Sequence, residues 1–304
     1  MPRRSFLRLA APLVAMLCVA LPANAQQTLG FGRLFTNDAI GDNRDRWRSA
    51  AINLSLLRGP SWSGALPTRP GEIIEYRFRT EWNTPADLSN PDPPSRPYAG
   101  VISLGAHTHF DWRSLEVAAG VDLFVLGEQT GLSDFQASLH DALSFPRVEI
   151  DGYEIDNSVQ LGATLEVARS FQVNDVSVRP FAELVAGPET LARVGADLSF
   201  AGFGSGALLV RDPVSGQRYR GIAGDGPAGL SVSLGADAAY VANSQYLPSS
   251  FGIEAEDTRY RVRAGLLYEG GVGSVFYGAT YLSEEFVGQP EGQIVGGLTI
   301  RLNF

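Results

Sequence analysis

Short segments in which polar and apolar residues alternate run through this chain from residue 49 onward, and they restrict its fold more than any other feature. The segments are rich in Val, Leu, Tyr, Phe and Gly, and turns rich in Gly, Pro, Asn and Asp separate them. A period of two residues is typical of β-strands with one polar and one apolar face. Since helical periodicity is scarce, the sequence predicts an all-β protein.

About twelve strands are predicted from these segments, and an even number is typical of bacterial outer-membrane barrels. The same alternation also fits a soluble β-sandwich in water. After residue 25 no run of about 18 apolar residues occurs, so a membrane-spanning helix is not expected. The predicted strands are 28–36, 48–58, 71–82, 98–109, 112–125, 158–170, 174–186, 190–202, 229–242, 258–270, 273–284 and 293–304.

Two of the predicted strands separate their charged and apolar side chains clearly. In the segment 231–241, Asp237 shares one face with two serines, and the other face is apolar. In the segment 260–268, Arg261 and Arg263 share one face. A barrel with a lipid-facing outer surface and a polar interior needs this pattern.

Three further features favour a membrane barrel over a soluble sandwich. Aromatic residues gather near strand ends, as an interfacial girdle would require. Connections alternate between short ones, such as Gly270 to Gly273, and long polar ones, such as Gly202 to Gly229, which match periplasmic turns and outer loops. The last strand ends at Phe304, and the outer-membrane assembly machinery is expected to recognise a terminal aromatic strand. We therefore predict a closed antiparallel transmembrane β-barrel, acting as a monomer. The girdle candidates are Tyr240, Tyr246, Phe251, Tyr268, Phe276, Tyr277 and Tyr281.

The N-terminus has the pattern of a secretory signal peptide over residues 1–25, which leaves 26–304 as one barrel domain. Two arginines precede an apolar run, and Ala23-Asn24-Ala25 forms a cleavage site. Removing three arginines and no acid changes the formal charge from −9 to −12, with 21 basic residues against 33 acidic. Such a charge disfavours nucleic acid binding. The single cysteine, Cys18, lies in the removed segment, so no disulfide is expected.

One helix is predicted, over residues 131–144. Ser133 is its expected N-cap, and Gln136 follows three residues later. Four apolar residues (Leu132, Phe135, Leu139 and Leu143) form a stripe at helical spacing. Gln136 and His140 are four positions apart and are therefore expected on one face, beside the stripe.

The richest polar stretch lies between the first two strands and contains Asn37 and Asp38. Carboxylate and amide oxygens suit Ca²⁺ or an oxyanion, although an Asx turn without further function explains the same residues. Zinc is disfavoured because cysteines are absent from the mature chain and the histidines are spread out. His107 and His109 alternate along a strand and are expected to face the lumen, whereas His140 stands apart on the helix.

Several motifs in their order along the chain resemble those of the lipid A 3-O-deacylases of the outer membrane, the LpxR type. The resemblance covers essentially the whole mature chain. Its most specific parts are Arg96-Pro97-Tyr98-Ala99-Gly100 and the Gln136-x-x-x-His140 helix. The remaining parts are Thr36-Asn37-Asp38, Asp45-Arg46-Trp47-Arg48-Ser49, Thr84-Pro85, Gly152-Tyr153 and Glu285-Phe286-x-Gly288-Gln289.

The resemblance implies a twelve-stranded barrel in the bacterial outer membrane that removes an ester-linked acyl chain from lipid A in a Ca²⁺-dependent hydrolysis. It implies that His140 is the general base, Asp38 a Ca²⁺ ligand and Asn37 an oxyanion or ligand-orienting donor. Ser49 stands where the family usually has threonine and retains the hydroxyl. Arg96 is expected to supply the positive charge of a family lysine that is missing here.

Two points stay open on the sequence. Ser49 could act as a nucleophile with His140 as its base, but no Gly-x-Ser-x-Gly turn is present, so we favour attack by water. The alternative functions are an outer-membrane phospholipase, which shares Ca²⁺, histidine and a barrel, and a non-catalytic porin. In a porin the Asn37-Asp38 stretch would only form a turn.

Overall fold

The computed structural model describes residues 26–91 and 95–302 of the chain. The predicted signal peptide and the terminal Phe304 lie outside the described residues. Within the described ranges, no helix is long and apolar enough to cross a membrane.

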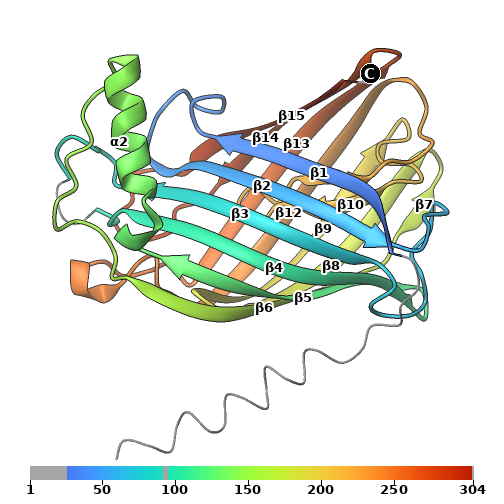
Figure 1. The fold of residues 1–304 in the computed structure, drawn as a ribbon, viewed down its shortest axis with the longest axis horizontal. Coiled ribbons are helices and arrows are strands. Elements are labelled where there is room, and N and C mark those ends of the chain that lie inside the picture. The colour runs from blue at the N-terminus through green and yellow to red at the C-terminus, as the bar shows by residue number, and fades with distance from the viewer. Residues whose placement is uncertain (1–25, 92–94, 303–304) are drawn as a thin grey trace, which may run out of the picture.

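Twelve long antiparallel strands close into a barrel (Figure 1). The ring closes at two places, where β1 pairs with β15 and β6 pairs with β8. This confirms the predicted closed barrel, and each predicted wall strand overlaps an observed one. The wall strands are β1 (Gln27–Asn37), β2 (Trp47–Gly59), β3 (Ile74–Thr84), β4 (Ala99–Trp112), β5 (Leu115–Leu126), β6 (Ser158–Ala168), β8 (Val176–Ala186), β9 (Glu189–Phe200), β12 (Gly229–Ser244), β13 (Thr258–Gly270), β14 (Gly273–Leu282) and β15 (Gln293–Leu302). The short β7 (Phe171–Val173) pairs with β8 alone.

Polar and apolar side chains alternate between the lumen and the outer surface, as the period of two predicts. Arg261 is 5% exposed, whereas its neighbour Tyr260 is 53% exposed on the outer surface. Four girdle tyrosines are exposed as predicted. The girdle prediction is wrong for Tyr246 and Phe276, which are 3% and 5% exposed and face inward. The exposed girdle tyrosines are Tyr240, Tyr268, Tyr277 and Tyr281.

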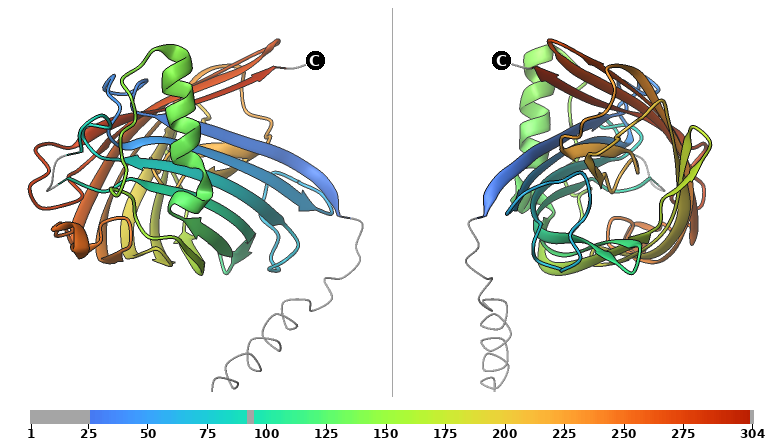
Figure 2. Two further views of the ribbon diagram at one scale, coloured as in Figure 1. Left: turned by 60° about the vertical axis from the view of Figure 1, so that its left-hand side comes forward. Right: turned by 90° about the vertical axis from the view of Figure 1, so that its right-hand side faces the viewer.

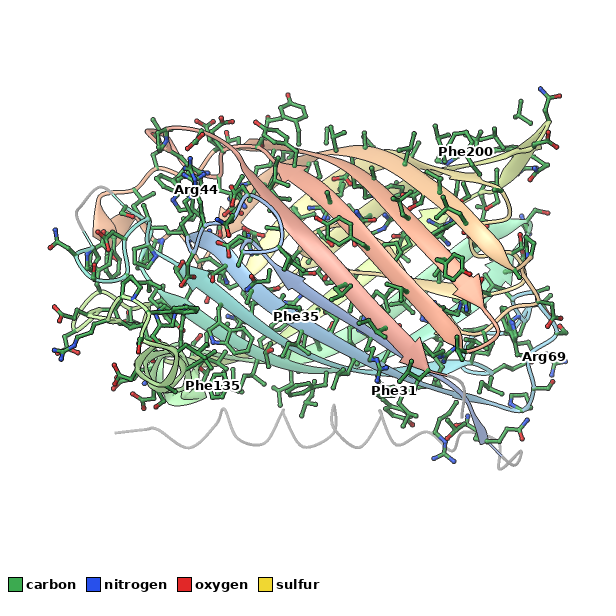
Figure 3. All side chains as sticks on the ribbon, turned by 90° about the horizontal axis from the view of Figure 1, so that it is seen from above. Phe31, Phe35, Arg44, Arg69, Phe135 and Phe200 are labelled. Atoms are coloured by element: carbon green, nitrogen blue, oxygen red, sulfur yellow. The ribbon has the colours of Figure 1, made fainter. Side chains whose placement is uncertain are left out.

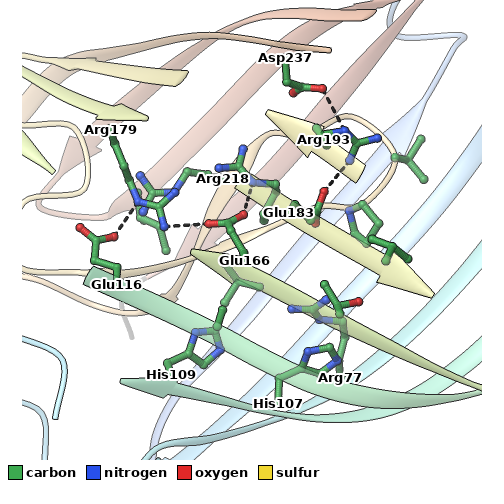
Figure 4. Close-up of a pocket in the computed structure, with 18 of the residues that line it drawn as sticks. Arg77, His107, His109, Glu116, Glu166, Arg179, Glu183, Arg193, Arg218 and Asp237 are labelled. Atoms are coloured by element: carbon green, nitrogen blue, oxygen red, sulfur yellow. Dashed lines mark hydrogen bonds and ion pairs between the residues drawn. The ribbon is translucent and has the colours of Figure 1, made fainter. Parts of the chain in front are cut away.

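Ion pairs fill much of the lumen. Figure 4 shows Arg179 between two carboxylates, with 2.6 Å from its Nε to Glu116 and 2.8 Å from its Nη2 to Glu166. The same figure shows Arg193 between Glu183 and Asp237. Pairing of this kind is required because an isolated charge inside a barrel would lose its hydration without compensation. A cavity of about 720 Å³ remains between these side chains.

The long connection after β9 does not form an outer loop, so that prediction is wrong. It leaves the same end of the barrel as the 271–272 turn, and it folds back into the lumen as the hairpin β10 (Leu208–Arg211) and β11 (Arg218–Ile222) (Figure 2). The chain turns inward there because Val210 and Tyr219 are apolar or aromatic and pack with wall residues such as Leu34.

Two glycines in β1 make room for this luminal hairpin. A Cβ atom added at Gly30 would lie 2.2 Å from the Gly221 carbonyl oxygen, and one at Gly32 would lie 2.8 Å from the Arg220 carbonyl oxygen. Both close contacts are with backbone, which cannot rotate away. The hairpin therefore depends on the absence of side chains at these positions.

We expect Gly30→Val to lower the free energy of unfolding by about 1–3 kcal/mol, because the new side chain forces the hairpin away from β1. Urea unfolding of the refolded barrel in detergent measures the change. Gly271→Ala is the control, since a Cβ atom at Gly271 meets nothing within 4 Å; it should change stability by less than about 0.5 kcal/mol. Equal stability of the two variants would contradict the packing argument.

Candidate active site on the outer side of the barrel wall

The loop between β1 and β2 holds Asp38 in a buried position. Its backbone N–H donates to the Ser49 carbonyl oxygen at 3.0 Å, and its Oδ2 accepts from the backbone N–H of Arg46 at 2.7 Å. The other carboxylate oxygen, Oδ1, is buried and has no hydrogen-bond partner in the described part of the chain. A buried carboxylate oxygen without a donor is a ready ligand for a cation.

A β-bulge in β2 brings Ser49 to the outer side of the wall. Arg48 pairs with Asn83 of β3 and Ala50 pairs with Trp82, so Ser49 is the extra residue between them. The bulge allows Arg48 to point into the lumen, where it contacts Glu285, while the hydroxyl of Ser49 donates to Asp45 outside. Without the bulge, alternation counted from Asn53, which contacts Asp212 in the lumen, would place Ser49 inside the barrel and Arg48 outside.

Helix α2 (Leu132–Leu143) lies across the outer face of the barrel near one rim (Figure 1). Leu132 packs against Trp82 of β3, whose indole N–H donates to the Leu132 carbonyl oxygen at 3.2 Å. The helix is confirmed, but Ser133 is not its N-cap. Gly131, with φ 67°, takes that position without a side-chain hydrogen bond, and Ser133 is buried in the first turn.

The apolar stripe of α2 turns away from the protein. Phe135 is 58% exposed (Figure 3), and Leu139 and Leu143 are 44% and 53% exposed. Most of the stripe therefore packs against no core residue. The buried face carries Gln136 and His140, each 6% exposed. A helix with its polar face inward and its apolar face outward suits contact with lipid.

His140 meets Asp45 between α2 and the wall. Its Nε2 lies 3.1 Å from Asp45 Oδ2, and its Nδ1 lies 2.7 Å from the Pro146 carbonyl oxygen. Because a carbonyl oxygen only accepts, the proton on Nδ1 is assigned by this contact. The ring orientation is thus held from the side opposite Asp45.

Asp45 is the common partner of the site. Its Oδ1 accepts from the Ser49 hydroxyl and, at 3.5 Å, from Gln136 Nε2. Tyr98 in turn donates to Gln136 Oε1 at 3.0 Å. The Asp45 side chain is 38% exposed, so solvent reaches this partner of His140. The roles of Asp45 and Tyr98 were not predicted from the sequence, although both lie inside the motifs that carry the family resemblance.

The environment of Asp38 is short of positive charge. Burial first, and then the carboxylates of Asp45 and Asp42, raise the pKa of Asp38 to about 8, although the Arg46 N–H opposes the change. Asp42 also has a buried oxygen, Oδ1, that has no hydrogen-bond partner among the residues that the structure describes. Among the described residues no three His, Cys, Asp or Glu side chains form a ready metal cluster. The loop therefore fits a hard cation that completes its shell with backbone oxygens and water.

The other two predicted site residues, Asn37 and Arg96, lie in different parts of the structure. Asn37 lies beside Asp38, and its Oδ1 accepts from the Ala39 N–H at 2.8 Å, which is the predicted Asx turn. Arg96 is fully buried and forms an ion pair with Glu285, not with His140 or Asp45. Burial first, and then the guanidinium groups of Arg48 and Arg259, lower the pKa of Arg96 to about 10. Arg96 therefore belongs to the luminal charge network.

His107 and His109 face the lumen, as predicted. His107 Nε2 lies 3.1 Å from Asp122, and His109 Nε2 lies 2.8 Å from Glu75. Each histidine has its own carboxylate partner, so the two do not share a site with His140.

Comparisons with known proteins agree with this architecture. A family model described as outer membrane protein LpxR matches residues 9–304. The structure of LpxR from Salmonella typhimurium is similar, with a TM-score of 0.72 and 15% identity, over 90% of this chain and 100% of that chain. A NanC porin reaches a TM-score of 0.44 and 6% identity over 90% of this chain and 100% of that chain. No match was found among curated proteins.

We expect the metal-free protein to lose stability as the pH rises from about 4 to about 8. The folded state holds a proton on Asp38 that the unfolded chain releases near pH 3.8, so the free energy of unfolding falls over this range. Asp38→Asn should remove this contribution and be more stable than the wild type at pH 8. Urea unfolding at pH 5 and pH 8 with a chelator measures it.

The matched control is Asp87→Asn. Hydrogen bonds from Ser89 lower the pKa of this exposed carboxyl, so its contribution to stability changes only in more acidic solution. A wild-type profile that is flat between pH 5 and pH 8 would contradict the burial of an uncompensated Asp38.

Proposed function

The chain belongs to the LpxR family of outer membrane proteins, and from this premise we propose that it hydrolyses an ester-linked acyl chain of lipid A at the site between α2 and the barrel wall. One observation carries the proposal: the contact between His140 and Asp45 lies on the outer side of the wall, beside the lipid-facing stripe of α2. An enzyme acting on a membrane lipid needs its acid–base group at such a place.

His140 acts as the general base. With Nδ1 donating to Pro146, Nε2 is the nitrogen that takes a proton from water. Asp45 Oδ2 lies 3.1 Å from Nε2, so this exposed carboxylate moves aside to admit the water, and it returns to pair with the imidazolium after the proton has been taken. The hydroxide attacks the ester carbonyl, and the imidazolium returns the proton to the leaving alkoxide.

Gln136 and Tyr98 are positioning residues. Tyr98 holds the carbonyl oxygen of the Gln136 side chain, which directs the amide nitrogen toward Asp45. Ser49 holds the same carboxylate oxygen. Asp45 is thereby kept between the wall and the helix, facing His140.

Asp38 is the residue that would hold Ca²⁺, through the buried oxygen that lacks a donor. A bound Ca²⁺ would polarise the ester carbonyl and stabilise the negative charge that develops on its oxygen. Asn37 supports the same charge, since its Oδ1 is engaged in the turn and its amide nitrogen stays available as a donor. Arg96 takes no part in this step, because its guanidinium group pairs with Glu285 in the luminal charge network.

Ser49 is not the nucleophile in this mechanism. Its hydroxyl donates to Asp45 and has no hydrogen bond to His140 within the described ranges, whereas a serine nucleophile needs a direct contact with its base. A phospholipase is the second candidate function, because the same outward-facing site would accept a glycerophospholipid ester. A porin function does not explain the site, because a histidine buried on the outer side of the wall has no role in passage through the lumen.

We expect His140→Asn to lower kcat about 10²- to 10⁴-fold, because asparagine keeps a similar size and one hydrogen bond but cannot accept the proton. Mass spectrometry of lipid A incubated with the purified barrel and Ca²⁺ measures deacylation. The control is His109→Asn, which removes a buried luminal partner of Glu75 and should leave kcat within a few-fold. Phosphatidylethanolamine and phosphatidylglycerol as substrates separate the deacylase from a phospholipase.

Chelation should abolish deacylation by the wild type, and excess Ca²⁺ should restore it. Asp38→Ala should need a much higher Ca²⁺ concentration or stay inactive. Activity that is indifferent to a chelator would leave Asp38 as a turn residue.

Ser49→Ala distinguishes the two nucleophiles. Under attack by water the variant should retain measurable activity, reduced about tenfold by the loss of one hydrogen bond to Asp45. No acyl group should appear on the wild-type protein in intact-mass spectra after rapid quenching. A covalent acyl adduct on Ser49 would overturn the water mechanism.

A further inference from the structure

The pairing between the first and last strands covers only part of their length. β1 and β15 share three residue pairs, and the last of these toward the end with the termini is Phe35 with Leu298. Beyond it the two strands diverge toward that end of the barrel (Figures 1 and 2). Two side-chain bonds cross the gap: Arg33 Nη2 donates to the Ile300 carbonyl oxygen, and Thr299 Oγ1 donates to the Arg33 carbonyl oxygen at 2.6 Å.

A pocket of about 390 Å³ lies in this gap and is separate from the site beside α2. The luminal hairpin forms its inner wall and the ends of β1, β14 and β15 its sides. Its polar lining is strongly basic, with Arg33, Arg218, Arg220 and Arg301 and no carboxylate.

Positive charge in this pocket is largely uncompensated. Arg220 pairs with Glu269 at 2.6 Å. Arg301 has no ion pair or side-chain hydrogen bond to any part of the chain that the structure describes, and Arg33 bonds only to a carbonyl oxygen. Arg218 differs from these two, because its guanidinium group also lines the large luminal cavity, where it lies beside Glu166 (Figure 4). The other luminal arginines have carboxylate partners, as the pairs of Arg179 and Arg193 illustrate. The three remaining guanidinium groups, of Arg33, Arg220 and Arg301, against the one carboxylate of Glu269 favour an anion.

The surroundings of the pocket are apolar and face the membrane. Phe31 and Leu302 line it and are 45% and 58% exposed on the outer surface, and Ile300 beside them is 46% exposed. An anion that enters from this side therefore carries its charge into the gap while its apolar part stays against the wall. A free inorganic ion would make no use of these side chains.

We propose that the gap between β1 and β15 binds the phosphate of an anionic phospholipid, in the leaflet at the end of the barrel that carries the termini. Arg33 and Arg301 contact the phosphate oxygens, since guanidinium groups match phosphate with paired hydrogen bonds. The acyl chains lie along Phe31 and Leu302. The lipid thereby supplies the negative charge that the protein lacks there. It also fills the gap where β1 and β15 form no backbone hydrogen bonds with each other.

Native mass spectrometry of the mature chain in detergent, titrated with phosphatidylglycerol, tests the proposal. We expect one tightly bound phosphatidylglycerol and much weaker binding of zwitterionic phosphatidylcholine. The double variant Arg33→Gln, Arg301→Gln should bind phosphatidylglycerol about 10- to 30-fold more weakly, because each arginine near a lipid phosphate contributes about 1 kcal/mol. Arg69→Gln removes one positive charge, as the single variant Arg301→Gln does, at a side chain that is 83% exposed in a loop; it is the control and should bind as the wild type does.

Heat-modifiable migration on gels verifies folding of each variant, and Arg301→Gln alone, at the end of β15, replaces the double variant if that one does not fold. Inorganic phosphate at millimolar concentration should not displace the lipid. Displacement by phosphate would assign the pocket to a free anion and overturn the lipid proposal. So would equal binding of the two phospholipids, or unchanged binding in the arginine variants.

Discussion

Each residue of a strand in a membrane barrel must face either lipid or lumen, and the rest of this structure depends on that choice. The lumen-facing positions of β3, β8, β9, β12 and β13 carry charges that have lost their water, so each needs a partner of opposite sign. The candidate active site arises where the alternation is interrupted. At the bulge in β2, Arg48 keeps its luminal contact with Glu285 while Ser49 turns outward to Asp45. Because of this extra residue, two neighbouring side chains serve different places: Arg48 joins the luminal ion pairs and Ser49 joins the outer site.

The sequence was sufficient for the wall because the period of two is a local signal that each strand repeats. It was insufficient for the luminal hairpin, since β10 and β11 have four and five residues, and their charges resemble those of a solvated loop. Ser133 was misassigned because a serine near a helix start favours capping, whereas Gly131 in the left-handed conformation starts this helix. Tyr246 and Phe276 have the composition of girdle residues, and only tertiary packing shows that they face inward.

The candidate site shows the same division between local and long-range information. His140 and Asp38 follow from motifs, and both are buried beside the wall. The central position of Asp45 does not follow, because it depends on the closure of β1 to β4 into one curved sheet beneath α2. Arg96 lies within a specific motif, but the chain turns its side chain into the lumen. A motif therefore identifies the neighbourhood of a residue better than the direction of its side chain.

The luminal hairpin also has a consequence for the kinetics of folding. Its contacts join Gly221 to Gly30, and Tyr219 to Ser55, across most of the length of the chain. Contacts between residues so distant in sequence form slowly, because a long loop must close before they contribute any stability. The luminal hairpin is therefore expected to slow the closure of the barrel, although it never touches the lipid.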